Sequence, residues 1–158
     1  MVHGIHRRGN DEPATTSETE MIIGPTEVAD VMTAKVVTLS PYHSFSDAAN
    51  LMNDRFFRHC VVVDTHNQVV GVISDRDILR ALARNPNSRT KSLDQIMTHN
   101  PVTVRRNTLI ADAVGKIISK RINCLPVVEE DGSVCGIVTS TDLLRSYQQL
   151  LDMMYKPR

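Results

Sequence analysis

The stretch GVISDRD at residues 71–77 returns, with its pattern intact, as GIVTSTD at residues 136–142. In both copies a glycine opens an apolar run that ends in a hydroxyl residue, and an aspartate follows three positions later. This spacing is typical of a capping box at the start of a helix. It also suits a nucleotide site, because free N–H groups at a helix N-terminus can hold phosphate and a nearby aspartate can accept both ribose hydroxyls. The stretch by itself leaves both interpretations open.

The repetition extends outward from this stretch at one constant offset. Met32 in VMTAKVVTLS corresponds to Met97 in IMTHNPVTVR, an offset of 65 residues (97 − 32). The same offset pairs Gly71 with Gly136 and Asp77 with Asp142, and no gap is needed. A self-similar period of this length marks a repeated structural unit. The chain is therefore interpreted as one unit written twice.

Each copy predicts the element order β-α-β-β-α. A short strand (36–39 or 102–104) precedes a helix, an apolar hairpin follows (59–74 or 124–139), and a second helix begins near Asp75 or Ser140. The apolar residues at helical spacing in the first helix of each copy are Phe45, Ala48, Ala49, Met52 and Phe56, and then Ile110, Ala113, Val114, Ile117 and Ile118. We expect an α/β fold of two pseudo-symmetric halves packed sheet to sheet, with two related clefts between them.

The repeat divides the chain into five predicted segments. These are a flexible N-terminal tail (1–25), the first repeat (26–82), a linker (83–92), the second repeat (93–147) and a C-terminal helical extension (148–158). The extension outlasts the repeat and carries Leu150, Leu151 and Met154 at helical spacing. We expect these side chains to cover a subunit interface in a homodimer.

Composition narrows the class of protein. Lys plus Arg and Asp plus Glu both number 18 in the 158 residues, so no overall field favours nucleic acid or an anionic membrane. No apolar run approaches the length of a bilayer span, and the N-terminus lacks the apolar core of a secretory signal. Cys60, Cys124 and Cys135 have no CxxC spacing, and the histidines form no ligand pair, which predicts no metal site. We expect a soluble, cytoplasmic protein with reduced, buried thiols.

The signatures of catalysis are absent from the sequence. There is no GxxxxGK[ST] phosphate loop and no Gly-x-Ser-x-Gly nucleophile elbow, and no Cys–His pairing follows from the spacing. No residue is assigned a catalytic role, and the sequence predicts a protein that is not an enzyme.

The two copies together resemble a tandem pair of CBS domains, also called a Bateman module. The likeness covers residues 26–147 and rests on paired motifs in the same order: VADVMT and LDQIMT, VTL and VTV, CVVVD and LPVVE, GVISDRDIL and GIVTSTDLL. Proteins of this family commonly bind AMP, ADP, ATP or S-adenosylmethionine reversibly in clefts between the repeats. The resemblance implies that the aspartate holds the ribose hydroxyls and that the hydroxyl residue contacts phosphate, with no covalent cofactor.

The resemblance also implies two sets of binding residues, each combining one repeat's helix start with the other repeat's strands, which would hold the adenine. Arg58 and His59 would add donors for phosphate in the first set. The set for the Asp142 cleft is Thr139, Thr141, Asp142, Val36, Val37, Phe57, Arg58, His59 and Cys60. The set for the Asp77 cleft is Ser74, Arg76, Asp77, Pro101, Val102, Ile122, Asn123, Cys124 and Leu125.

Three functions remain open at this point. The first is a sensor of an adenosine ligand that passes its occupancy to a separate effector protein by a population shift. The second is a ligand-free structural module for dimerisation or interaction. The third, polynucleotide binding, is disfavoured by the balanced charge.

Overall fold

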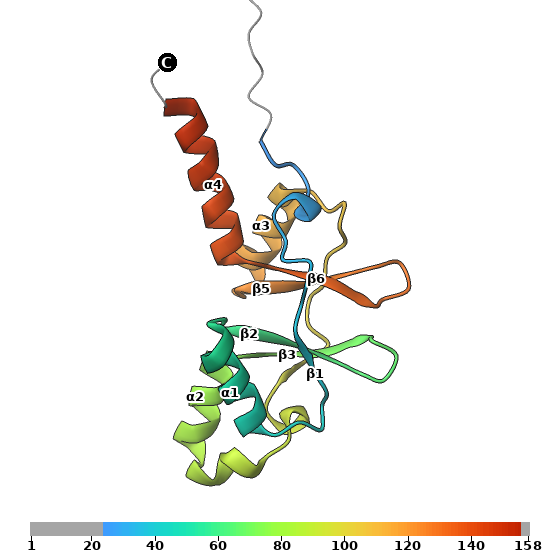
Figure 1. Cartoon of the computed structure of the whole chain (residues 1–158), viewed down its shortest axis with the longest axis vertical. Helices are drawn as coiled ribbons and strands as arrows, with labels where there is room; N and C mark the ends of the chain where they lie inside the picture. Colours follow the sequence, from blue (N-terminus) through green and yellow to red (C-terminus); the bar gives the residue numbers. More distant parts are fainter. Residues whose placement is uncertain (1–23, 156–158) are drawn as a thin grey trace, which may run out of the picture.

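Two β-sheets face each other at the centre of the molecule, and each carries a pair of helices on its outer side (Figure 1). The structure is a computed structural model that describes residues 24–155. Most of the predicted N-terminal tail and the last three residues of the predicted extension lie outside that range. The order of layers is therefore helix, sheet, sheet, helix, which confirms the α/β class and the sheet-to-sheet packing of the two halves.

The first half begins with a segment that leads into a four-stranded sheet of order β1-β2-β3-β4. Its β1 runs parallel to β2, which pairs antiparallel with β3 as the predicted hairpin. Its own elements are η1 (Val28–Asp30), β1 (Thr38–Leu39), α1 (Phe45–Arg55), β2 (His59–Val63), β3 (Val69–Ser74), α2 (Asp75–Arg84) and η2 (Pro86–Thr90). Helix α1 buries Phe45, Ala48 and Met52 against this sheet, and α2 buries Ile78.

The second half repeats the plan around a two-stranded sheet, β5-β6. Its elements are η3 (Leu93–Gln95), β4 (Thr98–His99), α3 (Ile110–Lys120), β5 (Cys124–Val128), β6 (Val134–Thr139) and α4 (Ser140–Tyr155). The predicted strand at 102–104 is reduced to a single parallel bridge between Val104 and Val127. The turn between β5 and β6 places Gly132 at φ 84°, a conformation that glycine adopts without strain.

The opening segment of each repeat packs on the other repeat, an exchange that the local sequence pattern does not predict. Thr98 of β4 pairs with Val72 of β3, and at the position related by the repeat Thr33 pairs with Ile137 of β6. The buried side chains follow the same exchange, since Leu93 and Met97 lie in the core of the first half and Val28 in that of the second. Each half is therefore completed by residues from the other copy.

The two halves are held together by an apolar layer and by their hairpin turns. Val61 and Val72 of one sheet pack with Cys124 and Ile137 of the other. At the hairpin turns, the N–H of Val134 donates to the carbonyl of Asn67 at 3.0 Å. These contacts fix the halves to each other on the side of the turns, seen at the right of Figure 1.

Two details of the predicted helices differ from the structure. Phe56, predicted on the buried face of α1, ends that helix as its cap and is 95% exposed. Ile118 lies on α3, as predicted, but its side chain is exposed rather than packed. The segment predicted as a linker is packed, because η2 lies against α2 and the buried Ser88 hydroxyl donates to the carbonyl of Ala81 at 3.0 Å.

Candidate functional site

A cleft of about 580 Å³ opens between the two halves. The starts of both α2 and α4 border it, so two helix N-termini converge on one space. The first half also contributes the approach to β1 and the turn between α1 and β2. The lining residues are Thr33, Lys35, Val36, Val37, Phe56, Phe57, Arg58, His59, Ser74, Asp75, Arg76, Asn123, Ile137, Thr139, Ser140, Thr141, Asp142 and Arg145.

A closed set of hydrogen bonds shapes the start of α4. Oδ2 of Asp142 accepts the Thr139 backbone N–H at 2.8 Å and the Thr139 hydroxyl at 2.7 Å. The N–H of Asp142 in turn donates to the hydroxyl oxygen of Thr139 at 3.3 Å. The second carboxylate oxygen, Oδ1, lies 3.6 Å from Nη1 of Arg145. One oxygen of Asp142 thus holds the helix start, while the other faces the largely exposed guanidinium of Arg145.

The same geometry recurs at the start of α2 and at a helix away from the cleft. Oδ2 of Asp77 accepts the N–H of Ser74 at 2.8 Å and its hydroxyl at 2.7 Å. Oδ2 of Asp47 accepts the same two groups of Ser44, at 2.7 and 2.8 Å, at the start of α1. The capping interpretation of the hydroxyl–acid spacing is therefore confirmed. Only position separates a plain cap from a candidate site, and Thr139 and Asp142 line the cleft whereas Ser44 and Asp47 lie outside it.

The residues predicted for the Asp142 cleft come together with one exception. All members of that set line the cleft except Cys60, whose side chain is fully buried in the core of the first half. The alternation of side chains along β2 explains the exception, since Cys60 and Val62 point toward the helices and Val61 points toward the other sheet. Cys60 is therefore core, not cleft wall.

The residues predicted for the Asp77 cleft divide in the structure. Ser74, Arg76 and Asn123 line the same cleft as Asp142, because α2 starts beside His59 on the paired strand. Leu125 is fully buried in the core of the second half, and Cys124 lies in the apolar layer between the sheets. The other members of that set, which lie outside the lining of this cleft, are Asp77, Pro101, Val102 and Ile122.

Charge in the cleft is mainly positive. Lys35, Arg58, Arg76 and Arg145 line it, against the carboxylates of Asp75 and Asp142. Nε of Arg58 donates to Oδ2 of Asp75 at 2.8 Å, an ion pair that lies largely in solvent. Two cations, Lys35 and Arg76, thus add to the pairs Arg58–Asp75 and Arg145–Asp142, which gives the space an electrostatic preference for anions.

His59 lines the same cleft and lies near several of these charges. Burial lowers the pKa of its imidazole below the ordinary 6.5, and Arg58 and Arg76 lower it further. Asp75 and Asp77 act against this and raise the pKa, but burial is the largest cause. The side chain is therefore a neutral imidazole at neutral pH, which can donate or accept a hydrogen bond.

Seven lining residues lie outside both predicted sets, namely Thr33, Lys35, Phe56, Asp75, Ile137, Ser140 and Arg145. One of them has an unusual conformation. Phe56 follows the last residue of α1, with φ 57° and ψ 33° in the left-handed region. Its apolar character and helical spacing placed it on the buried face of the helix, so the sequence offered a misleading signal. The next residue, Phe57, packs partly against the core of the first half.

Other chemistry is sparse in the part of the chain that the structure describes. Within residues 24–155, no three His, Cys, Asp or Glu side chains gather as a metal site would require. Burial raises the pKa of the Cys60 and Cys124 thiols to about 12, which disfavours the reactive thiolate. Among the same residues, no helix has the length and apolarity needed to cross a membrane.

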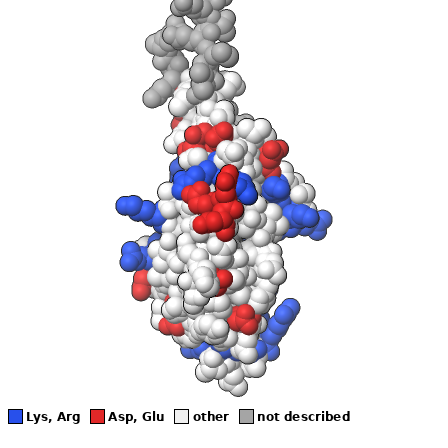
Figure 2. Space-filling model, turned by 90° about the vertical axis from the view of Figure 1, so that its right-hand side faces the viewer, with Lys and Arg blue, Asp and Glu red and all other residues white. Residues whose placement is uncertain are grey.

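The face that carries the hairpin turns mixes both signs of charge. Figure 2 shows basic and acidic side chains interspersed there. Arg106 donates from Nε to Glu129 at 2.8 Å, and Arg105 lies 3.9 Å from Glu130. A face of paired charges lacks the one-signed field that attracts a phosphate backbone.

Comparisons with known proteins agree with this architecture. The sequence model of the CBS domain family matches residues 28–84 and again residues 93–149. A homoserine O-acetyltransferase of Methanohalobium evestigatum is 33% identical over 124 residues, which cover 78% of this chain but only 24% of the relative. The chain thus spans about a quarter of that enzyme's length, and the match carries no acetyltransferase activity to it.

Two solved structures resemble the fold closely. The CBS domain pair of protein MJ0100, in complex with 5-methylthioadenosine and S-adenosyl-L-methionine, superposes with a TM-score of 0.72 at 32% identity. That likeness covers 77% of this chain and 99% of the other. CBSX2 in complex with AMP also gives a TM-score of 0.72, at 28% identity, with 80% and 99% covered. Both of these CBS proteins hold adenosine compounds.

Proposed function

This chain belongs to the CBS domain family, and from that membership we propose that it is a regulatory module that binds an adenosine-containing ligand between its two halves. The ligand binds reversibly. Whether it is bound is signalled to a separate effector protein. The residues proposed to hold it are those that line the cleft at the starts of α2 and α4.

One observation carries the proposal: an aspartate at a helix start, an apolar strand wall and basic side chains meet in a single cleft. Asp142 supplies an oxygen, Oδ1, for the ribose hydroxyls, while Thr139 to Thr141 present a hydroxyl and a helix N-terminus to phosphate. Val36, Val37 and Phe57 supply an apolar surface for a base. The volume of about 580 Å³ lies within the range of small-molecule sites.

The charge of the cleft favours a ligand that carries phosphate. Four basic side chains face two carboxylates, and the neutral His59 adds no charge to either side. A nucleotide such as AMP or ADP brings negative charge to this space, whereas S-adenosylmethionine brings a cationic sulfonium. We therefore expect phosphorylated adenosine compounds to bind more tightly than S-adenosylmethionine.

Transmission follows from the position of the cleft between the halves. A ligand that touches both the α2 start and the α4 start stabilises the relative orientation in which both contact it. The hairpin turns, the apolar layer and the opening segments already join the halves, so the ligand adds one more contact between them, at the cleft. A partner protein that binds this orientation more tightly than others then responds to the ligand.

Assembly into a homodimer is part of the proposal. Helix α4 carries Leu144, Tyr147, Met153 and Met154 as exposed apolar or aromatic side chains, and Leu150 and Leu151 are half-buried. An apolar groove of about 480 Å³ lies beside it and is lined by residues of α3 and α4. Exposed apolar surface of this kind is typical of a subunit interface, and a second copy of this chain is its proposed occupant.

One observation favours a second function, that of a ligand-free interaction module. The hydroxyl and acid at each candidate helix start satisfy each other without any ligand. If capping is their whole role, the exposed face of α4 is the functional surface and the cleft is incidental.

A thermal-shift panel separates these functions. Wild type, Asp142→Ala and Asp77→Ala are heated with AMP, ADP, ATP with and without magnesium, and S-adenosylmethionine. A ligand at about one hundred times its dissociation constant stabilises the folded state by about 2.7 kcal/mol. We expect a nucleotide to stabilise wild type and Asp77→Ala, and to lose this effect with Asp142→Ala. The two variants are matched, because each removes the acceptor of one capping box; a panel without any shift would support the ligand-free module.

A further inference from the structure

Phe56 is the least expected residue of the cleft. It is 95% exposed, and its backbone lies in the left-handed region at φ 57° and ψ 33°. Glycine and asparagine are the usual residues at such a helix end, because a side chain with a β-carbon is strained there. A bulky aromatic ring in solvent and in this conformation adds nothing to the stability of the free fold.

The equivalent residue of the second repeat shows that the left-handed backbone at this helix end is a feature of the fold. Arg121 stands 65 residues later, ends α3 in the same way, and has φ 53°. Both repeats therefore need a left-handed residue between their first helix and the following strand. The backbone requirement is shared, but a phenylalanine occurs at only one of the two positions.

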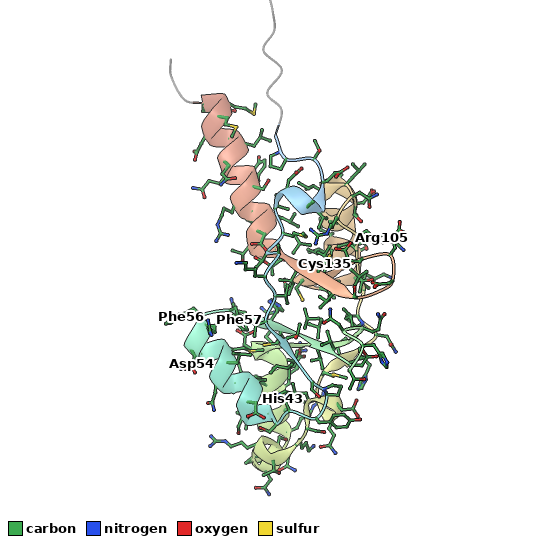
Figure 3. The ribbon with its side chains drawn as sticks, turned by 45° about the vertical axis from the view of Figure 1, so that its right-hand side comes forward. His43, Asp54, Phe56, Phe57, Arg105 and Cys135 are labelled. Atoms are coloured by element: carbon green, nitrogen blue, oxygen red, sulfur yellow. The ribbon has the colours of Figure 1, made fainter. Side chains whose placement is uncertain are left out.

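The location of Phe56 connects it with the cleft. Phe56 belongs to the lining of the space between the halves, with Phe57, Arg58 and His59 of the same turn. Figure 3 shows Phe56 and Phe57 next to each other at the end of α1, on the side of the first half that faces the second half. Phe57 packs partly on the core, whereas Phe56 projects from it.

We propose that Phe56 is a specificity-determining residue that covers the base of the bound ligand by aromatic stacking. This inference rests on the proposed function and deepens it, because it assigns recognition of the ring system to a residue outside the helix starts. The apolar surface of Val36 and Val37 takes one side of the base, and the exposed ring closes the other. A planar heteroaromatic base is the ligand feature that such a ring recognises.

The proposal predicts opposite effects on stability and affinity. Phe56→Gly removes the strain of the left-handed backbone, so the midpoint of thermal unfolding of the free protein is unchanged or higher. The same variant loses the stacking surface, and we expect its affinity for AMP to fall about tenfold. A residue with a merely structural role would not raise stability and lower affinity together.

Arg121→Gly is the matched control. It relieves the same backbone conformation at the related position but lies outside the lining of this cleft, so its affinity for AMP stays at the wild-type value. Phe56→Asn tests the same point with a side chain that tolerates the left-handed region. Ribose 5-phosphate, which lacks a base, is the control ligand, and its binding is the same in wild type and Phe56→Gly.

The experiment is isothermal titration of AMP and ribose 5-phosphate into wild type, Phe56→Gly, Phe56→Asn, Phe56→Trp and Arg121→Gly. The chain contains no tryptophan, so Phe56→Trp introduces a single tryptophan at the cleft, and AMP is expected to quench or shift its emission. If wild type binds AMP and Phe56→Gly binds it equally, the role of Phe56 is overturned and the proposed function stands. If wild type binds none of the adenosine compounds, both are overturned. A change in oligomeric state by light scattering, at unchanged AMP affinity, would make Phe56 an interface residue and also overturns the inference.

Discussion

The hydroxyl of Thr139 donates to Oδ2 of Asp142 across 2.7 Å, and the same oxygen accepts the backbone N–H of Thr139 at 2.8 Å. This pair caps α4 and lines the cleft at the same time. The pair of Ser44 and Asp47 has the same hydrogen bonds at α1 but lies outside the cleft. The proposed function therefore predicts that helix stability and ligand affinity are linked at Thr139 and Asp142 and separate at Ser44 and Asp47.

Thr139→Ala and Ser44→Ala test this difference. Each loses the hydroxyl that accepts the N–H of the third helical residue, and we expect each to lower the free energy of unfolding by about 1 kcal/mol. Only Thr139→Ala should weaken AMP binding. Urea unfolding gives the first quantity and calorimetric titration the second. Equal AMP affinity in the two variants would leave Thr139 as a cap alone.

His59 predicts a dependence of stability on pH. Its folded pKa is lowered, chiefly by burial, below the ordinary 6.5 of the unfolded chain, with Arg58 and Arg76 acting in the same direction and Asp75 and Asp77 against them. The unfolded state therefore binds the proton first as pH falls. The stabilising contribution is complete above pH 6.5 and is lost as pH falls from there toward the folded pKa.

His59→Gln removes this titration. The difference in free energy of unfolding between wild type and variant, measured by urea unfolding from about pH 8 to about pH 5.5, should shift against wild type as the solution becomes more acidic. A difference that stays constant across this range would contradict a lowered pKa for His59. Adenosine and AMP extend the test, since a phosphate near His59 raises the imidazole pKa and makes only AMP bind better at the acidic end.

Gly136 lies close to the opening segment of the first repeat, at Met32 and Thr33, and this close approach requires a glycine. A β-carbon there would lie 2.8 Å from the sulfur of Met32 and 3.1 Å from the carbonyl oxygen of Thr33, which is backbone and yields little. We expect Gly136→Ala to lower the free energy of unfolding by about 1–3 kcal/mol. Gly115→Ala is the control, because a β-carbon meets open space on α3 and alanine is a better helix former. Chemical unfolding of both variants should give opposite signs.

The proposed dimer predicts a further pair of variants. Met154 on α4 is 54% exposed, so Met154→Asp leaves the described core intact while it places a charge on the proposed interface. Light scattering at micromolar concentration should show a dimer for wild type and a monomer for Met154→Asp. Tyr42→Asp, at an exposed residue before α1, should stay dimeric. A wild-type protein that is monomeric under these conditions would exclude the dimer.

The sequence predicts only part of the candidate site. The spacing of Thr139 and Asp142 identified a helix start, since a cap involves residues three apart and is a local property. The resemblance predicts Cys60 in the cleft, but the alternation of side chains along β2 directs it into the core. Helical spacing predicts Phe56 on a buried helix face, yet α1 ends one residue before it.

By itself the sequence determined the repeat, the order of its elements, the two hairpins and the helix starts at Asp75 and Ser140, because periodicity, turns and caps depend on neighbours close in the chain. Only the tertiary structure decided that the segment before each first strand completes the other half, through pairs such as Thr33 with Ile137. It also decided that the starts of α2 and α4 meet in one cleft. Those outcomes depend on contacts between residues far apart in sequence, where burial and backbone pairing across the two sheets select one arrangement among those that the local pattern permits.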